Sequence, residues 1–157
     1  MITYRLPVLA VRDVKVSKRF YHDLFDQEVK IDLGRSITFS GGFAVQEKFD
    51  ELTDVPEITV LHQSHNLELY FEVDNFDAFM DKLHGMLDVE LVHTPKTNAW
   101  GRRVVRLYDP DWHMIAVAES LGVVVKRLLG EGLTVEQIAQ LTQMPEAFVE
   151  QCRKGME

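Results

Sequence analysis

The chain of 157 residues contains an internal repeat, and this repeat restricts its fold more than any other feature. Residues 4–11 have the apolar pattern of a strand, and an acidic turn leads from them into a helix whose apolar residues recur every three or four positions. Residues 67–73 form a second strand pattern, which again leads through an acidic turn into an amphipathic helix. An offset of about 62 positions superposes the two units. The sequence therefore predicts two copies of one module.

Three short strand patterns follow each predicted helix, so each half is predicted to be βαβββ. They cover 28–33, 36–40 and 42–48 in the first half, and 89–93, 103–108 and 113–118 in the second. Gly41-Gly42 and Asp109-Pro110-Asp111 are turn signals between strands. Residues 50–66 are the predicted connector, with a short strand expected at 58–61. The buried helix faces are predicted to carry Phe20, Tyr21, Leu24 and Phe25 in the first helix, and Phe76, Phe79, Met80, Leu83 and Leu87 in the second.

The pattern becomes entirely helical after residue 120, and we call residues 121–157 the tail. Thr134 and Gln137 form a capping box, and Pro145 is placed to start a further helix. The tail resembles helix-turn-helix segments, but it carries four basic residues against five glutamates, which disfavours DNA binding. Its apolar stripes need a cover, either the rest of the chain or a second subunit, so we expect a bracing or dimerisation element.

The charge and cysteine content exclude several classes of protein. Seventeen Lys and Arg against 25 Asp and Glu give a formal charge of −8, which disfavours nucleic acid or an anionic membrane as partner. The single cysteine, Cys152, excludes an internal disulfide framework and a multi-cysteine metal site. The N-terminal apolar run is too short for a signal peptide or a membrane span, so we expect a cytoplasmic protein.

Three segments resemble the vicinal oxygen chelate superfamily, which includes glyoxalases, bleomycin-resistance proteins and extradiol dioxygenases. They are VLAVRDVKVSKRFYHDLFDQEV, LELYFEVDNFDAFMDKL and WGRRVVRLYDPDWHMIAVAE, and the resemblance covers residues 3–119. It implies an α+β domain over residues 1–120, in which two βαβββ modules, about 1–60 and 61–120, form a curved mixed-sheet, open-barrel cleft. The tail would be a C-terminal helical extension. The resemblance also implies pairing within the chain or in a homodimer.

Strand alternation predicts which side chains face that cleft. Because the odd-numbered residues of 67–73 are apolar, the even-numbered ones should face the ligand. The resemblance also places Trp100 at the cleft mouth, where it would stack on a ligand or anchor its loop. The predicted ligand-binding residues are Leu6, Gln46, Glu68, Tyr70, Trp100, Arg102, Arg106, Met114 and Ala116.

The resemblance places metal ligands at the positions of Leu6, Gln46, Glu68 and Ala116. A leucine and an alanine cannot ligate a metal, and a Lewis-acid site usually needs three protein ligands. None of the six histidines occupies a matching strand position. We therefore predict no metal and no cofactor, with a divalent metal as the disfavoured alternative.

Glu68 has two readings of equal weight. It is either a general base whose pKa rises in a partly apolar cup, or a carboxylate neutralised by Arg102 or Arg106. The leading prediction is a small-molecule-binding protein without a complete metal site, acting on a small organic ligand. One alternative is a metal-dependent glyoxalase-type lyase, isomerase or dioxygenase that uses Glu68. The other is a regulatory or interaction protein that acts through the tail.

Overall fold

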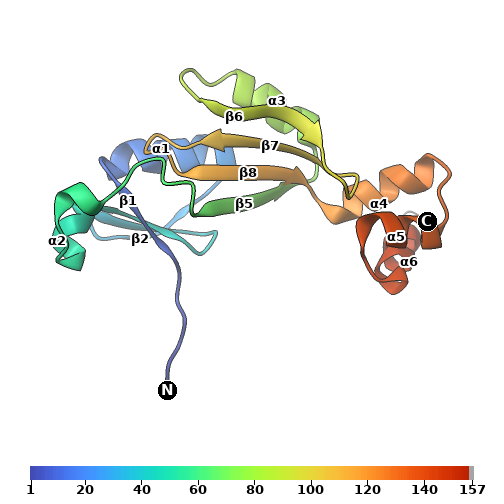
Figure 1. Cartoon of the computed structure of the whole chain (residues 1–157), viewed down its shortest axis with the longest axis horizontal. Coiled ribbons are helices and arrows are strands. Elements are labelled where there is room, and N and C mark those ends of the chain that lie inside the picture. Colours follow the sequence, from blue (N-terminus) through green and yellow to red (C-terminus); the bar gives the residue numbers. More distant parts are fainter. Residues whose placement is uncertain (156–157) are drawn as a thin grey trace. The chain divides into compact units, whose positions relative to one another are not determined.

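The computed structural model describes residues 1–155, and the first half has the predicted βαβββ order (Figure 1). Its elements are β1 (Val8–Val11), α1 (Val14–Phe25), β2 (Val29–Asp32), β3 (Ser36–Phe39) and β4 (Ala44–Glu47). They form a mixed four-stranded sheet of order β1-β4-β3-β2, in which β1 and β4 are parallel and the other pairs are antiparallel.

The second half repeats this order, which confirms the prediction of an α+β fold made of two βαβββ modules. Its elements are β5 (Glu68–Val73), α3 (Phe76–His84), β6 (Leu91–Thr97), β7 (Arg103–Tyr108) and β8 (Met114–Glu119). Its sheet has the order β5-β8-β7-β6, which is the order of the first sheet with each strand replaced by its repeat.

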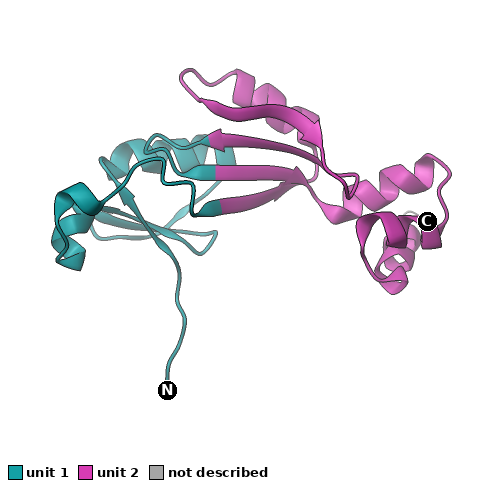
Figure 2. Ribbon diagram, viewed as in Figure 1, with its two compact units in different colours: residues 1–68, 108–114 teal, residues 69–107, 115–157 magenta. Residues whose placement is uncertain are grey.

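The chain divides into two compact units whose boundary differs from the module boundary (Figure 2). One unit contains residues 1–68 and 108–114, and the other contains residues 69–107 and 115–157. The turn between β7 and β8 thus belongs with the first half of the chain, while the tail belongs with the second.

Helix α1 forms the core of the first unit by packing on β3 and β4. Asp13 caps it, because its carboxylate accepts hydrogen bonds from the backbone N–H groups of Lys15 and Val16. Tyr21 of α1 is fully buried, and its ring lies 5.3 Å from that of Phe39 and 4.9 Å from that of Phe43. Aromatic rings at these separations add to the stability that burial provides.

The second unit has the burial pattern that alternation predicts. Along β5, exposed and half-buried residues alternate, and the predicted apolar face of α3 is buried at Phe76, Phe79, Met80 and Leu83. Arg103 of β7 holds the start of α3, since its guanidinium lies 2.7 Å from Asp77 and stacks 4.9 Å from the Phe76 ring centroid.

The tail folds into α4 (Leu121–Gly130), α5 (Val135–Thr142) and α6 (Glu146–Lys154), with the predicted capping box at Thr134. The three helices pack on one another, so their apolar stripes largely cover each other. Their shared core consists of Val124, Val125, Leu128, Ile138 and Val149.

Three details of the sequence prediction are wrong. The connector contains α2 (Phe49–Thr53) and a short 3₁₀ helix at Glu57–Thr59, in place of a strand at 58–61. Leu87 lies beyond the end of α3 and is 90% exposed, because the helix stops one turn earlier than the apolar pattern. Strand β1 begins only at Val8. Within residues 1–155, no helix is long and apolar enough to span a bilayer.

Candidate functional site

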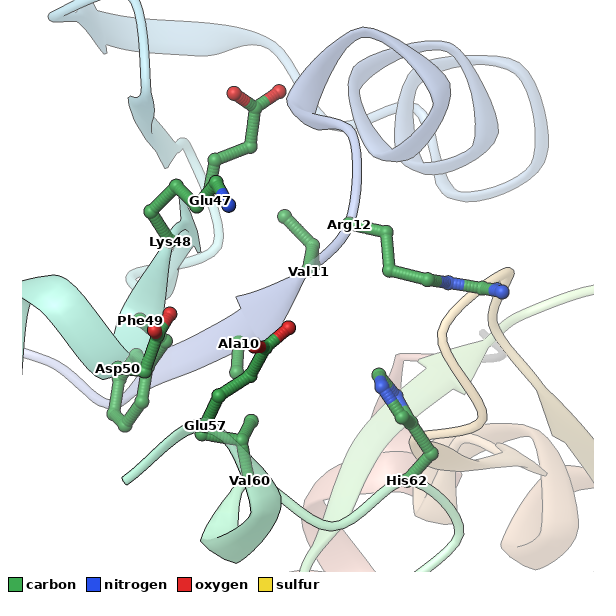
Figure 3. A pocket seen from close by; sticks show the side chains of 10 residues that line it. All are labelled: Ala10, Val11, Arg12, Glu47, Lys48, Phe49, Asp50, Glu57, Val60 and His62. Carbon is green, nitrogen blue, oxygen red and sulfur yellow. The ribbon is translucent and has the colours of Figure 1, made fainter. Parts of the chain in front are cut away.

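The first unit contains a pocket of about 230 Å³ at the end of its sheet (Figure 3). The parallel pairing of β1 with β4 places Val11 opposite Glu47, so the ends of both strands open into the same space. The connector supplies the opposite wall with Glu57, Val60 and His62. The full lining is Ala10, Val11, Arg12, Glu47, Lys48, Phe49, Asp50, Glu57, Val60 and His62.

Arg12 is held by the turn between β7 and β8. Its backbone N–H and its Nε both donate to Oδ1 of Asp111, at 3.0 and 2.8 Å, and its Nη2 donates to the carbonyl of Pro110. The Asp111 side chain is 3% exposed whereas that of Arg12 is 63% exposed. A buried carboxylate therefore fixes a guanidinium that stays accessible, and a fixed guanidinium is suited to binding a ligand carboxylate.

His62 is oriented by the same turn. Its Nδ1 lies 3.3 Å from the carbonyl oxygen of Asp111. Because a carbonyl only accepts hydrogen bonds, Nδ1 carries the proton in this contact, which leaves Nε2 of the neutral ring as an acceptor.

The turn itself is anchored in the core by Asp109. Tyr21 donates its hydroxyl proton to Oδ2 of Asp109 at 2.8 Å, and Nδ1 of His113 lies 2.9 Å from the same oxygen. Oδ1 accepts from the backbone N–H groups of Asp111 and His113. Burial, followed by the charge of Asp109, raises the pKa of Tyr21 well above its ordinary value, so the phenol remains a donor.

The acidic side chains of the pocket differ in whether they have a hydrogen-bond partner in the protein. Oε1 of Glu47 accepts a hydrogen bond of 2.8 Å from the backbone N–H of Val14, in the first turn of α1. The carboxylates of Asp50 and Glu57 have no hydrogen-bond or ion-pair partner within residues 1–155. They are therefore open to a ligand.

None of the ligand-binding residues predicted from the sequence lines this pocket. Gln46 is the nearest along the chain, but its Nε2 donates to the Glu47 carbonyl at 2.6 Å. Leu6 precedes β1 and is half-buried. Ala116 is fully buried in a cluster with Val104 and Ala118, so it does not reach solvent.

Arg102 of the predicted face serves the structure of the second unit. Its Nη2 lies 2.6 Å from Glu72, and its Nε donates to the Glu119 carbonyl at 2.8 Å. Its guanidinium also lies 5.7 Å from the ring centroid of Tyr70, which is half exposed. The cross-strand carboxylate that Arg102 neutralises is thus Glu72, and the two readings of Glu68 stay predictions.

The remaining predicted residues are spread over the second sheet and its loops. Nη1 of Arg106 lies 3.4 Å from Nε2 of His93, and Met114 is half-buried. Trp100 is 46% exposed, and its backbone N–H donates to Asn98 within a turn of the 98–102 loop. Glu68 is exposed at the start of β5.

Glu119 is a buried charged residue that the sequence analysis missed. It is 1% exposed and accepts hydrogen bonds from the backbone N–H and Nε of Arg103, while Arg127 of the tail lies 3.4 Å away. Burial by itself would raise the pKa of Glu119, but these hydrogen bonds and the two arginine charges together hold it below its ordinary value. Glu119 thus joins β8 to β7 and to the tail.

The residues at the ligand positions that the resemblance implies do not fit a metal ion. Across residues 1–155, no three His, Cys, Asp or Glu side chains lie close enough together to hold a metal ion. Leu6 and Ala116, at two of the four expected ligand positions, have no donor atoms.

Sequence reasoning also missed the pocket, because its lining comes from strand ends and from the connector, where alternation gives no information. The sequence did contain one signal. Arg12 and Asp111 are oppositely charged, and they lie in two turns of the segments that resemble the superfamily: the turn after the first strand and the turn before the last strand. Their separation of 99 positions hides the pairing.

Comparison with known proteins identifies the family. The Glyoxalase-like domain family matches residues 4–122. A protein of unknown function from Agrobacterium tumefaciens str. C58 is 35% identical, with a TM-score of 0.66 over 77% of this chain and 96% of its own. No curated protein matches the chain.

Two further solved structures share the fold at lower identity. A glyoxalase/bleomycin resistance protein/dioxygenase family enzyme from Burkholderia phytofirmans PsJN is 16% identical, with a TM-score of 0.63 over 73% of this chain and 95% of its own. The fosfomycin resistance protein FosX from Mesorhizobium loti is 19% identical, with a TM-score of 0.55 over 82% of this chain and 99% of its own. The chain therefore belongs to the glyoxalase-like domain family, within the vicinal oxygen chelate superfamily.

Proposed function

We propose that this protein binds a small organic molecule without a complete metal site, and that the pocket at the ends of β1 and β4 takes part in binding. The observation that carries the proposal is that Arg12, at the end of β1, and His62, in the connector, both line the pocket and are both held by Asp111. Side chains that are oriented before binding lose less entropy when a ligand arrives. A concave site with a few oriented polar groups is typical of small-molecule binding.

Two of the four expected metal-ligand positions hold Leu6 and Ala116, whose side chains have no donor atoms, and this supports the metal-free part of the proposal. Elemental analysis of protein purified from medium supplemented with zinc, iron, manganese and nickel should find each metal well below one equivalent per chain. A stoichiometric metal would instead favour the alternative of a metal-dependent lyase, isomerase or dioxygenase.

Nuclear magnetic resonance of the ¹⁵N-labelled full chain tests the binding part. A library of small organic compounds should include members that shift the amide signals of Ala10, Lys48 and His62. Val60→Trp, which places an indole in the pocket, should weaken those shifts. Leu87→Trp is the matched control, because Leu87 is exposed and outside the pocket, and it should leave the shifts unchanged. A library that perturbs no pocket amide would refute the proposal.

The second face predicted from the sequence is tested separately through Glu68. If this face also contacts the ligand, Glu68→Gln should weaken binding of compounds found in the library. If binding and any turnover stay unchanged in that variant, Glu68 is not a ligand-binding residue.

A further inference from the structure

We infer that the pocket of the first unit selects a small molecule with a carboxylate at one end and a primary ammonium group at the other. This inference rests on the proposed function and adds the class of ligand. Figure 3 shows Arg12 on one side of the pocket and Asp50 on the other, with Glu57 of the connector between them. Groups that bind anions and groups that bind cations therefore face the same space from different sides.

Some charged side chains of the pocket already have a partner in the protein. The ligand would supply the charge that pairs with the others. Arg12 is paired with Asp111 at 2.8 Å, and Glu47 accepts the Val14 N–H at the positive end of α1. Lys48 also lines the pocket and offsets one of its three negative charges. The carboxylates of Asp50 and Glu57 are left over, and a ligand ammonium group can pair with either.

The opposite side binds through directional hydrogen bonds. A guanidinium has five N–H donors, and the described contacts of Arg12 use only those of Nε and Nη2. Its Nη1 hydrogens are not used by these contacts and remain available to a ligand carboxylate. The volume of about 230 Å³ lies below the range typical of drug-sized ligands, so it fits a small metabolite.

The test uses a series of ω-amino acids that differ in the distance between the ammonium and the carboxylate group. Glycine, 3-aminopropanoate, 4-aminobutanoate, 5-aminopentanoate and 6-aminohexanoate are titrated into the labelled full chain, each beside the alkylamine and the carboxylate of the same length. One chain length should bind about tenfold more tightly than either singly charged analogue, since a charged hydrogen bond contributes roughly 1.5–3 kcal/mol. If no member of the series exceeds its analogues, the inference is wrong.

Variants test which pocket residues bind the ammonium end of the ligand and which bind its carboxylate end. Glu57→Gln should weaken the amino acid and the amine about tenfold and leave the carboxylate unchanged. Arg12→Lys should weaken the amino acid and the carboxylate and leave the amine unchanged, because a lysine lacks the Nη1 donors. Glu51→Gln is the matched control, because Glu51 lies on α2 beside Asp50 but pairs with Arg35 and does not line the pocket. Equal effects of Glu57→Gln and Glu51→Gln would overturn the assignment.

The outcomes separate this inference from the proposed function. If library compounds bind the pocket but amino acids show no preference, the ligand class is wrong while small-molecule binding stands. If neither the library nor the amino acids perturb pocket amides, both fail together.

Discussion

At the scale of single residues, Asp109 joins α1 to the turn between β7 and β8. Its carboxylate accepts hydrogen bonds from Tyr21 and from two backbone N–H groups, and it is 4% exposed. A buried carboxylate is stable only when its oxygens have donors, and here the donors come from α1 and from the turn that holds Arg12. The geometry of the pocket therefore depends on a residue that does not line it.

Removing the Tyr21 hydroxyl should destabilise the fold. Tyr21→Phe leaves a buried oxygen of Asp109 with one donor fewer, so the free energy of unfolding should fall by about 1–3 kcal/mol. Urea denaturation at pH 7 measures this change. Tyr4→Phe is the control, because Tyr4 is 81% exposed, and its stability should match that of the unchanged protein. Equal stability of both variants would contradict the role given to Asp109.

Glu119 should make stability depend on acidity. The pKa of Glu119 is lower in the folded chain than the ordinary value of about 4.3, so its ionised form stabilises the fold above that value. This contribution is lost as the pH falls through the folded pKa. Glu119→Gln should therefore be less stable than the unchanged protein at pH 7, and the difference should shrink below pH of about 4. Chemical denaturation across pH 3–7 tests this, and a constant difference would refute it.

Contacts between residues that are close along the chain were predictable from the sequence, and contacts between distant residues were not. The capping box of Thr134 and Gln137 joins residues three apart and was predicted correctly. The contacts of Arg12 with Asp111 and of Tyr21 with Asp109 span 99 and 88 positions, and no local pattern encodes them. Arg102 was expected to face a ligand, but its Nε donates to the Glu119 carbonyl 17 positions away.

At the scale of elements, the apolar patterns predicted the four strands and the one helix of each βαβββ module, because apolar side chains recur at the period of a strand or of a helix. The errors lie where the apolar residues are exposed. The connector is exposed over residues 51–59, so its apolar residues do not report a strand. The apolar residue Leu87 continues the spacing of α3 although the helix has ended.

The tail should be destabilised by a cavity in its own core. Ile138 is fully buried among α4, α5 and α6, so Ile138→Ala should cost about 2–5 kcal/mol of local stability. Hydrogen exchange should accelerate over residues 121–154, while amides of β3 and β4 keep their protection. Leu141→Ala is a control on α5, since Leu141 is 37% exposed. Uniform acceleration across the chain would show that the tail does not unfold separately.

At the scale of the whole molecule, the repeat predicted the architecture but could not predict the division into units. The internal repeat places one boundary between the modules and another before the tail. In the structure, the turn at 108–114 of the second module belongs to the first compact unit. Which segments pack together depends on side-chain contacts such as those of Asp109. The identity of the superfamily was predictable because its motifs are local, and the pocket was not because its lining is assembled from three segments.

We predict a homodimer in solution. Apolar side chains stay exposed near the start of the chain, where Met1, Ile2 and Tyr4 precede β1, and dimerisation would bury such surface. Size-exclusion chromatography with light scattering should give twice the mass of one chain. A variant beginning at Arg5 should shift toward the monomer if this segment contributes to the contact. A monomeric full-length protein would contradict the prediction.

The turn at 108–114 has a consequence for synthesis on the ribosome. The first unit needs Asp109 to receive the Tyr21 hydroxyl and Asp111 to receive Arg12, and both are translated long after α1. Native contacts between such distant positions slow folding, because a long loop must close before they form. The nascent first module must therefore wait for nearly the whole second module to emerge before its own core is complete.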